Sequence, residues 1–409
     1  MASRLTRRER DFIKGTFAAD THDFASAQEA FHDCAIYYET DALCIFFEAL
    51  PLRMMGRSRE ALDALNRALE VAPNFNGVYQ SEAYDYILLG EMQDAAVAVG
   101  RLRQSGHTEQ AAVLSGDLAF LRHDYATART AFTSVESVRV NQDWALGYGL
   151  LARLAAEQGR YGEAMRCLDQ GIDEARSHQD QESTAARLID RAYIESRQGK
   201  LGPSLQDVDA ALNIDSSPAA IIQVSAVLGY LATTAPGSDT LLAARLSTLK
   251  SKIPTAGSGV IFDLARYRVQ GEWLLSTGKP EAALDQFEKA DNLDATITDR
   301  EYLGRALAVL ANREKNSRTA QALRIKALTA YERIALHPES VWYYPQRSVP
   351  GLFADEMEDA LRLSQFLPSR PDIEQMNQQY SMLCSPSGRS LIVDRGSKLS
   401  NHLNPSKEE

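Results

Sequence analysis

The sequence predicts an all-α fold, an α-solenoid in which about nine or ten helical hairpins stack side by side. Residues 42–75 show the repeating unit, which consists of two helices separated at Gly56. In the second helix the small Ala61 and Ala68 flank Leu65, and small residues at such spacings let paired helices approach closely. Glycine returns at the equivalent turn of further units, as Gly90, Gly159, Gly199 and Gly278.

The composition favours the same architecture. The chain has 409 residues, of which 44% are hydrophobic and only 14 are prolines. Good helix formers such as Ala, Leu, Arg, Glu and Gln are abundant. In a repeat array each unit buries its apolar face against its neighbours, so a chain of this length needs no division into several globular cores.

The first hairpin is predicted to begin with a capping box. Thr6 is the expected N-cap, and Glu9 lies three residues further on, where its carboxylate reaches back to the cap. The units then follow in order along the chain. We expect them at residues 8–41, 42–75, 76–109, 110–139, 144–178, 184–218 and 264–294.

The pattern loosens in two places. Residues 218–254 form a degenerate unit, and the stretch 254–259 (PTAGSG) is the predicted hinge of the chain. Two helices at 352–366 and 372–384 are expected to cap the array, and the polar end of the chain is expected to be disordered. The predicted organisation is an N-terminal array at 1–254, a C-terminal array with capping helices at 255–384 and a flexible tail at 385–409.

The net charge of −11 comes from 44 basic and 55 acidic residues. This balance argues against a generic nucleic-acid binder, which usually presents a basic surface. No run of about 18 apolar residues is present to cross a membrane. The opening MASRLTRRERDF lacks the apolar segment of a signal peptide. We therefore expect a cytoplasmic protein that binds neither nucleic acid nor a membrane.

The four cysteines are Cys34, Cys44, Cys167 and Cys384, and none of them forms a C-x-x-C motif. We expect them to be buried thiols that act as small hydrophobic side chains in a reducing compartment.

The unit at residues 42–75 resembles a tetratricopeptide (TPR) repeat, whose period is about 34 residues, although Leu65 stands where an aromatic side chain is usual. The resemblance implies a right-handed superhelix whose concave face is lined by the first helix of each hairpin. A mixture of aromatic and arginine side chains on such a face suits the binding of a protein or peptide. The side chains that the register places there are Phe46, Arg53, Tyr84, Arg153, Tyr193, Arg197, Arg268, Glu272 and Arg305.

A closer resemblance lies in the order of features. The opening LTRRERDFIKG (residues 5–15), the weak middle units and the ending LTAYERIALHP followed by LSQFLPSRPDIEQMNQQYSML are similar to the TPR half of bacterial multidomain serine/threonine kinases and winged-helix regulators. The Gly-rich loop, H-R-D and D-F-G motifs of a kinase are not in the sequence. The resemblance therefore implies a sensory or partner-recruiting module rather than kinase activity.

The sequence contains none of the catalytic motifs that we looked for. It contains no phosphate-binding loop, no H-E-x-x-H motif and no Cys/His cluster, so we expect neither a cofactor nor a metal. The densest acidic run, residues 355–360 (DEMEDA), brings together Asp355, Glu356, Glu358 and Asp359. Paired carboxylates can do acid–base work, but we interpret this run as a solvated helix face.

Three hypotheses follow. The first is a non-enzymatic scaffold that binds a protein or peptide in its concave groove, as a subunit or regulatory part of a signalling assembly. The alternative is a receptor whose halves close around a small ligand or peptide signal at the predicted hinge. The third is an enzyme, a hydrolase or transferase with a reactive group among the helices. The sequence makes no prediction about the oligomeric state.

Overall fold

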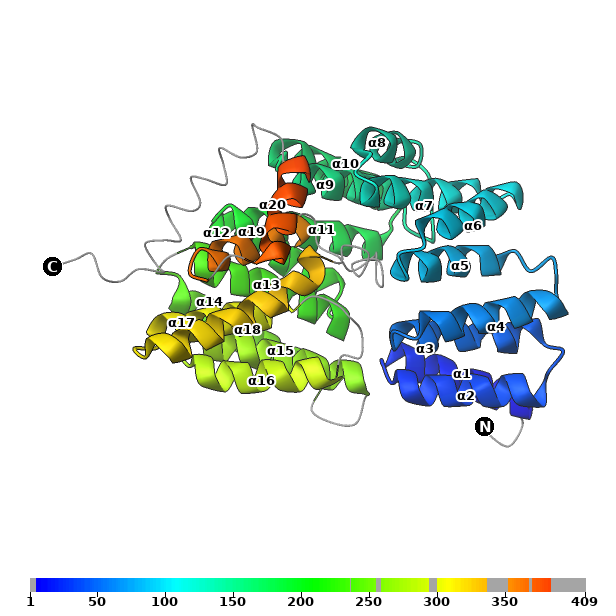
Figure 1. The fold of residues 1–409 in the computed structure, drawn as a ribbon, viewed down its shortest axis with the longest axis horizontal. Coiled ribbons are helices and arrows are strands. Elements are labelled where there is room, and N and C mark those ends of the chain that lie inside the picture. Colours follow the sequence, from blue (N-terminus) through cyan, green and yellow to red (C-terminus); the bar gives the residue numbers. More distant parts are fainter. Residues whose placement is uncertain are drawn as a thin grey trace.

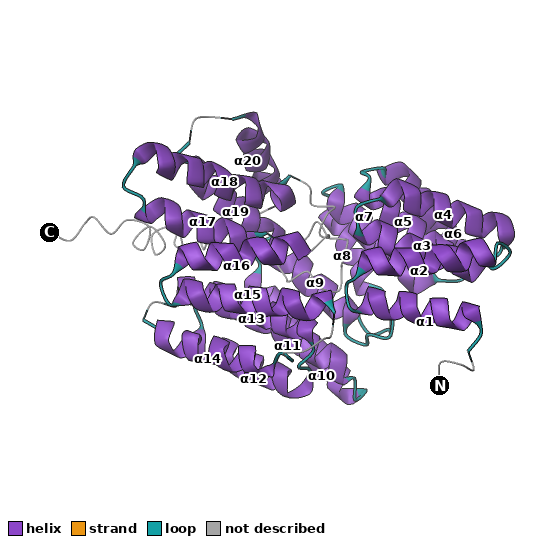
Figure 2. Ribbon diagram, turned by 90° about the horizontal axis from the view of Figure 1, so that it is seen from below, coloured by secondary structure: helices purple, strands orange, loops and turns teal. Residues whose placement is uncertain are grey.

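A computed structural model describes residues 5–235, 237–254, 259–293, 300–336, 352–367 and 370–383. Within these residues the ordered elements are twenty α-helices, and the only β pairing is an isolated bridge between Val140 and Asp143 (Figures 1 and 2). The predicted all-α solenoid of repeated hairpins is confirmed.

Short turns join most of the helices, and a longer segment lies between α8 and α9. The first ten are α1 (Arg7–Asp20), α2 (Phe24–Tyr37), α3 (Ala42–Met54), α4 (Ser58–Val71), α5 (Gly77–Leu88), α6 (Met92–Gln104), α7 (Thr108–Leu121), α8 (Tyr125–Thr133), α9 (Leu146–Glu157) and α10 (Tyr161–Ser177). The others are α11 (Gln181–Arg197), α12 (Leu201–Ile214), α13 (Pro218–Thr234), α14 (Asp239–Lys252), α15 (Val260–Ser276), α16 (Pro280–Leu293), α17 (Glu301–Arg313), α18 (Ser317–Ala335), α19 (Leu352–Ser364) and α20 (Pro371–Leu383).

Consecutive helices pair into hairpins, and each hairpin stacks on the next (Figure 1). First helices also contact the first helix of the following hairpin, as α3 contacts α5, α9 contacts α11, and α13 contacts both α11 and α15. We call the side of the array formed by α3, α5, α7, α9, α11, α13, α15 and α17 the first-helix face.

Close packing within hairpins rests on a glycine opposite a ring. A Cβ atom built on Gly271 would lie 2.2 Å from the ring of Phe287, and one built on Gly116 would lie 2.3 Å from that of Phe132. Such distances leave no space for a methyl group, so the first helix needs glycine where the second helix carries its ring. The turn glycines serve a different purpose. Gly159, at φ 72°, takes the left-handed conformation that ends a helix.

The beginning of the array agrees with the local rules. Thr6 and Glu9 form the predicted capping box: the Thr6 backbone N–H donates to the Glu9 carboxylate at 2.7 Å, and the Glu9 N–H donates to the Thr6 hydroxyl at 3.2 Å. This exchange satisfies two backbone N–H groups at the start of α1 that the helix leaves without a partner.

The array curves far enough for its first hairpin to meet α15. The Ile261 N–H donates to the carbonyl of Thr21 at 3.0 Å, and Gly259 (φ 103°) packs against the Thr21 side chain. The core of the predicted hinge, residues 255–258, lies outside the described residues. The division of the array at residue 254 stays a prediction, and α15 packs on both α13 and α14 across it.

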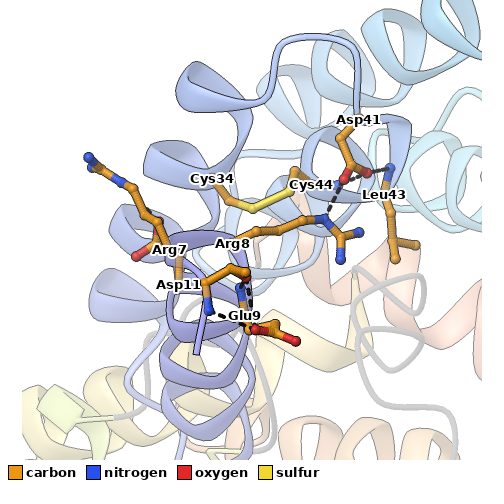
Figure 3. Close-up of a disulfide and its surroundings, with 9 residues drawn as sticks. Arg7, Arg8, Glu9, Asp11, Cys34, Asp41, Leu43 and Cys44 are labelled. Atoms are coloured by element: carbon orange, nitrogen blue, oxygen red, sulfur yellow. Dashed lines mark hydrogen bonds and ion pairs between the residues drawn. A yellow bond between two sulfur atoms is a disulfide. The ribbon is translucent and has the colours of Figure 1, made fainter. Parts of the chain in front are cut away.

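The structure corrects the expectation for two of the cysteines. Cys34, near the end of α2, and Cys44, near the start of α3, form a disulfide beside the ion pair of Arg8 with Asp41 (Figure 3). The corner between the two helices brings the Cα atoms to 5.4 Å, so both side chains enter the same seam. Cys167 is an unbonded thiol whose pKa is raised by burial.

Three sequence features fall outside the described residues: the aromatic connection at 340–350, Cys384, and the tail at 385–409. In the part of the chain that is described, no helix is both long and apolar enough to cross a membrane.

Candidate protein-binding face

The nine side chains predicted to bind a partner lie on the first helices, and most of them are buried. Phe46 and Tyr84 are partly exposed. The buried ones are Arg53, Arg153, Tyr193, Arg197, Arg268, Glu272 and Arg305. The first-helix face is therefore a packed row of charged and aromatic groups, in which each arginine already contacts other residues.

The row begins with a buried ion pair between α3 and α5. Arg53 donates from Nε and Nη2 to the two carboxylate oxygens of Asp85 at 3.0 and 2.7 Å, and Nη2 also donates to the carbonyl of Ser81 at 3.1 Å. The neighbouring Tyr84 has its pKa raised to about 12, chiefly by burial. Phe46 lies in an aromatic cluster, 5.0 Å from the ring of Phe75.

The row continues with pairs one repeat apart. Arg153 on α9 donates to Asp117 on α7 at 3.4 Å. Further along, Arg305 on α17 donates to both oxygens of Glu272 on α15 at 2.9 and 2.5 Å, and also to Glu301 at 2.9 Å. These sequence separations of 36 and 33 residues match one repeat, so each pair joins neighbouring first helices.

Aromatic rings also contact the arginines of the row. The Arg268 guanidinium lies 3.6 Å above the ring of Tyr302. Helix α13 has no charged residue at all, and its Tyr230 presents its ring to Arg197 at 4.4 Å and to Arg305 at 5.6 Å. Tyr193 packs edge-on against the same ring at 5.0 Å.

The carboxylate for Arg197 comes from α19, far along the chain. Arg197 Nη2 lies 2.9 Å from Asp355 Oδ1, and the Tyr193 hydroxyl donates to Asp355 Oδ2 at 3.2 Å. On the neighbouring α9, the Glu157 carboxylate accepts the backbone N–H of Ala354 at 2.8 Å. Helix α19 therefore lies against the first-helix face at α9 and α11. The same helix also packs on α18 (Figure 1).

These contacts overturn our interpretation of the acidic run. Asp355 is only 2% exposed and Glu358 is also buried, so this side of α19 is not a solvated helix face. The sequence analysis did not predict that Asp355 contacts Arg197 and Tyr193. The signal was present in α13, whose lack of any acidic residue leaves Arg197 without a carboxylate one repeat along.

The electrostatics are those of a buried, paired charge. Burial is the largest influence on Arg197 and opposes its charge, but Asp355 together with Tyr230, Tyr193 and Asp359 outweighs burial and keeps the pKa of this guanidinium above its ordinary value. Burial raises the pKa of the Tyr193 hydroxyl well above its usual range, so this group stays protonated and donates its hydrogen bond.

An open cavity of about 690 Å³ lies at the ends of the early hairpins, lined in part by Tyr38, Leu43 and Phe75. Among the residues described, no group of three or more His, Cys, Asp or Glu side chains could hold a metal ion.

Comparison with known proteins gives only loose matches. No family model and no curated protein matches this chain. Among solved structures, a tetratricopeptide repeat protein from Parabacteroides merdae is 16% identical with a TM-score of 0.37, over 74% of this chain and 98% of that one. The TPR domain of P58(IPK) is 14% identical with a TM-score of 0.25, over 92% and 98% of the two chains. The Cut9–Hcn1 hetero-tetramer of the APC/C is 12% identical with a TM-score of 0.34, over 98% and 95%. At these TM-scores the likeness carries no argument, and the TPR-like description rests on the hairpins and their contacts.

Proposed function

We propose that this chain is a non-enzymatic TPR-type scaffold that binds a protein partner along its first-helix face. The observation that carries the proposal is the position of α19. Its backbone and its Asp355 side chain are held by Glu157, Tyr193 and Arg197, which project from two different first helices. A face that seats a helix of its own chain has the shape and the polar groups to seat a helix of another protein.

A more specific role is suggested by the resemblance to the TPR half of bacterial multidomain kinases and winged-helix regulators. It favours a partner-recruiting module of a bacterial signalling assembly in the cytoplasm. The location has a direct check, because the Cys34–Cys44 bond is of a kind that the cytosol usually keeps reduced. Thiols are alkylated at lysis and the protein is analysed by mass spectrometry: Cys34 and Cys44 should both carry the alkyl group if the location is right, and an intact disulfide, as in the structure, would contradict the location.

The test of the proposed function is capture of binding proteins by the full chain in its native organism, followed by reconstitution with the purified partner. Hydrogen exchange should then show protection of the first helices on binding. Replacement of the exposed Arg166 by leucine on α10 provides a control that leaves the first-helix face intact. Protection confined to second helices such as α10, α12 and α16 would contradict the proposal.

A receptor that closes around a small ligand or peptide signal is the second candidate. The contact between Ile261 and Thr21 favours it, since it joins the first hairpin to the part of the chain beyond the predicted hinge. Small-angle scattering separates the two candidates. A smaller radius of gyration on addition of a short peptide or metabolite mixture favours the receptor, and unchanged dimensions favour the scaffold.

A further inference from the structure

The contact between α11 and α19 differs from the rest of the charged row. Arg53, Arg153 and Arg305 each pair with a carboxylate on a neighbouring first helix. Arg197 instead pairs with Asp355, which belongs to a helix laid against the row. Because α13 offers no acid, and because a buried guanidinium without a carboxylate is strongly unfavourable, this position requires an acidic group from outside the row.

The resident carboxylate satisfies Arg197 only in part. Asp355 forms an ion pair with Nη2 at 2.9 Å, whereas Nε of Arg197 is buried and has no hydrogen-bond partner among the described residues. A carboxylate that accepted from Nε and Nη2 together would make the two-pronged contact that arginine favours. The position therefore has unused binding capacity for an acidic ligand.

Helix α19 shows what such a ligand looks like. Its first turn offers a backbone N–H to Glu157 and an aspartate to Arg197 and Tyr193. The apolar side of the same helix buries Met357 and Ala360 completely. The features of α19 that a competing helix would share are thus a free first-turn N–H, an acid in that turn, and apolar side chains at helical spacing after it.

We propose that Glu157, Tyr193 and Arg197 form a docking site for an amphipathic helix of a partner protein with an acidic residue in its first turn, and that α19 is its resident competitor. This inference rests on the proposed function and specifies the partner. Because α19 is part of the same chain, it competes at a high effective concentration and lowers the apparent affinity for any helix supplied in trans.

The test uses the full chain and a fluorescent peptide of residues 352–366 with blocked ends, measured by fluorescence anisotropy. In the Asp355→Asn variant α19 loses its hold on Arg197, so the peptide should bind at least about tenfold more tightly than it binds the wild-type chain. The matched control is Asp372→Asn, on the neighbouring α20, where the carboxylate pairs with Arg370. This control should bind the peptide as the wild type does.

Two further measurements separate release of α19 from a general loss of structure. Hydrogen exchange of the Asp355→Asn chain should speed up in α19 and stay unchanged in α9 and α11. A peptide that carries asparagine in place of Asp355 should lose the gain in affinity. Equal affinity of the peptide for the wild type and for the Asp355→Asn chain would overturn the inference, and so would faster exchange throughout the array.

Sedimentation velocity of the Asp355→Asn chain tests the assignment to another protein. If the released α19 docks on a second copy, a dimer appears with rising concentration and the assignment to a partner protein is overturned. Failure of the peptide experiment leaves the proposed function standing if a captured partner still protects first helices elsewhere on the face. The two failures are therefore distinguishable.

Discussion

Replacing Arg53 by methionine should strongly destabilise the N-terminal hairpins. The change removes the guanidinium and keeps most of the apolar side chain, and it leaves the Asp85 carboxylate without its partner on α3. Asp85 is 0% exposed, so water cannot take the place of the lost contacts. The pair makes hydrogen bonds of 3.0 and 2.7 Å, and losing one partner of such a buried pair costs about 3–5 kcal/mol.

Protonation of Asp85 reduces the loss of stability caused by removing Arg53. Burial already raises the pKa of this carboxyl group, and Arg53 is the main group that opposes the rise. Without Arg53 the pKa rises further and Asp85 takes up a proton more readily, which reduces the penalty of a buried charge. We therefore expect a loss near the lower end of the range, about 3 kcal/mol.

The assay is urea denaturation followed by circular dichroism at 222 nm. Arg57→Met is the matched control, because Arg57 lies four residues further on and its ion pair with Glu60 is exposed. An exposed pair of this kind is worth no more than about 0.5 kcal/mol. The double change Arg53→Met with Asp85→Leu should recover most of the loss, since an apolar pair can replace a buried ion pair.

A difference below about 1 kcal/mol between Arg53→Met and Arg57→Met would refute the reasoning. In that case Arg53 would contribute little to folding, and its prediction as a partner-binding side chain would gain support. A large difference means that the main role of Arg53 is to stabilise the fold. Any loss of partner binding in its variants would then need a stability control.

Three further predictions concern the array as a whole. Ala164→Leu should overpack the seam of its hairpin and lower the free energy of unfolding by about 1–3 kcal/mol. Arg166→Leu on the exposed side of the same helix should lower it by no more than about 0.5 kcal/mol. Equal shifts of the melting temperature would mean that the predicted register is wrong. Gly271→Ala should lower the melting temperature, because its new methyl group would lie 2.2 Å from a buried ring. Gly100→Ala should raise the melting temperature, because alanine favours the helix and its methyl group would have no atom within 4 Å. Burial raises the pKa of Glu195 to about 7, so its contribution to stability is full below its unfolded pKa and is lost as the pH rises through 7. The wild type should therefore lose about 1–3 kcal/mol more than Glu195→Gln between pH 5 and pH 8, and parallel pH profiles of the two proteins would contradict this.

The features that sequence analysis predicted correctly depend on near neighbours in the chain. Thr6 and Glu9 are three residues apart, and the turn at Gly159 needs one left-handed residue at a helix end. The pairing of helices follows from small residues opposite large ones at a fixed separation. Such signals repeat along the chain, so an error in one unit is corrected by the others.

The features that it missed depend on the curvature of the whole array. Tyr193 and Asp355 are 162 residues apart, and nothing near either residue indicates that they meet. The bond between Cys34 and Cys44 was missed for another reason. Those residues are only ten apart, but their meeting depends on the angle at which α2 passes into α3. Charge patterns also misled us, because a polar helix face can be buried when each charge has a partner.

Helix α13 sets the selectivity proposed for the docking site. A partner helix that displaced α19 without supplying an acid would leave Arg197 buried and unpaired, at a cost of about 3–5 kcal/mol. That cost corresponds to a loss of affinity of more than about a hundredfold, so apolar helices of the same shape are excluded. A carboxylate within the row itself should abolish this requirement.

Tyr230→Glu tests that consequence, because the ring of Tyr230 lies next to both Arg197 and Arg305. In this variant Arg197 gains an acid from α13, so hydrogen exchange of α19 should speed up even with Asp355 intact. Adding Asp355→Asn should then change the exchange of α19 no further, whereas it has a large effect when Tyr230 is present. If the two changes act independently, Arg197 does not hold α19 through its need for a carboxylate.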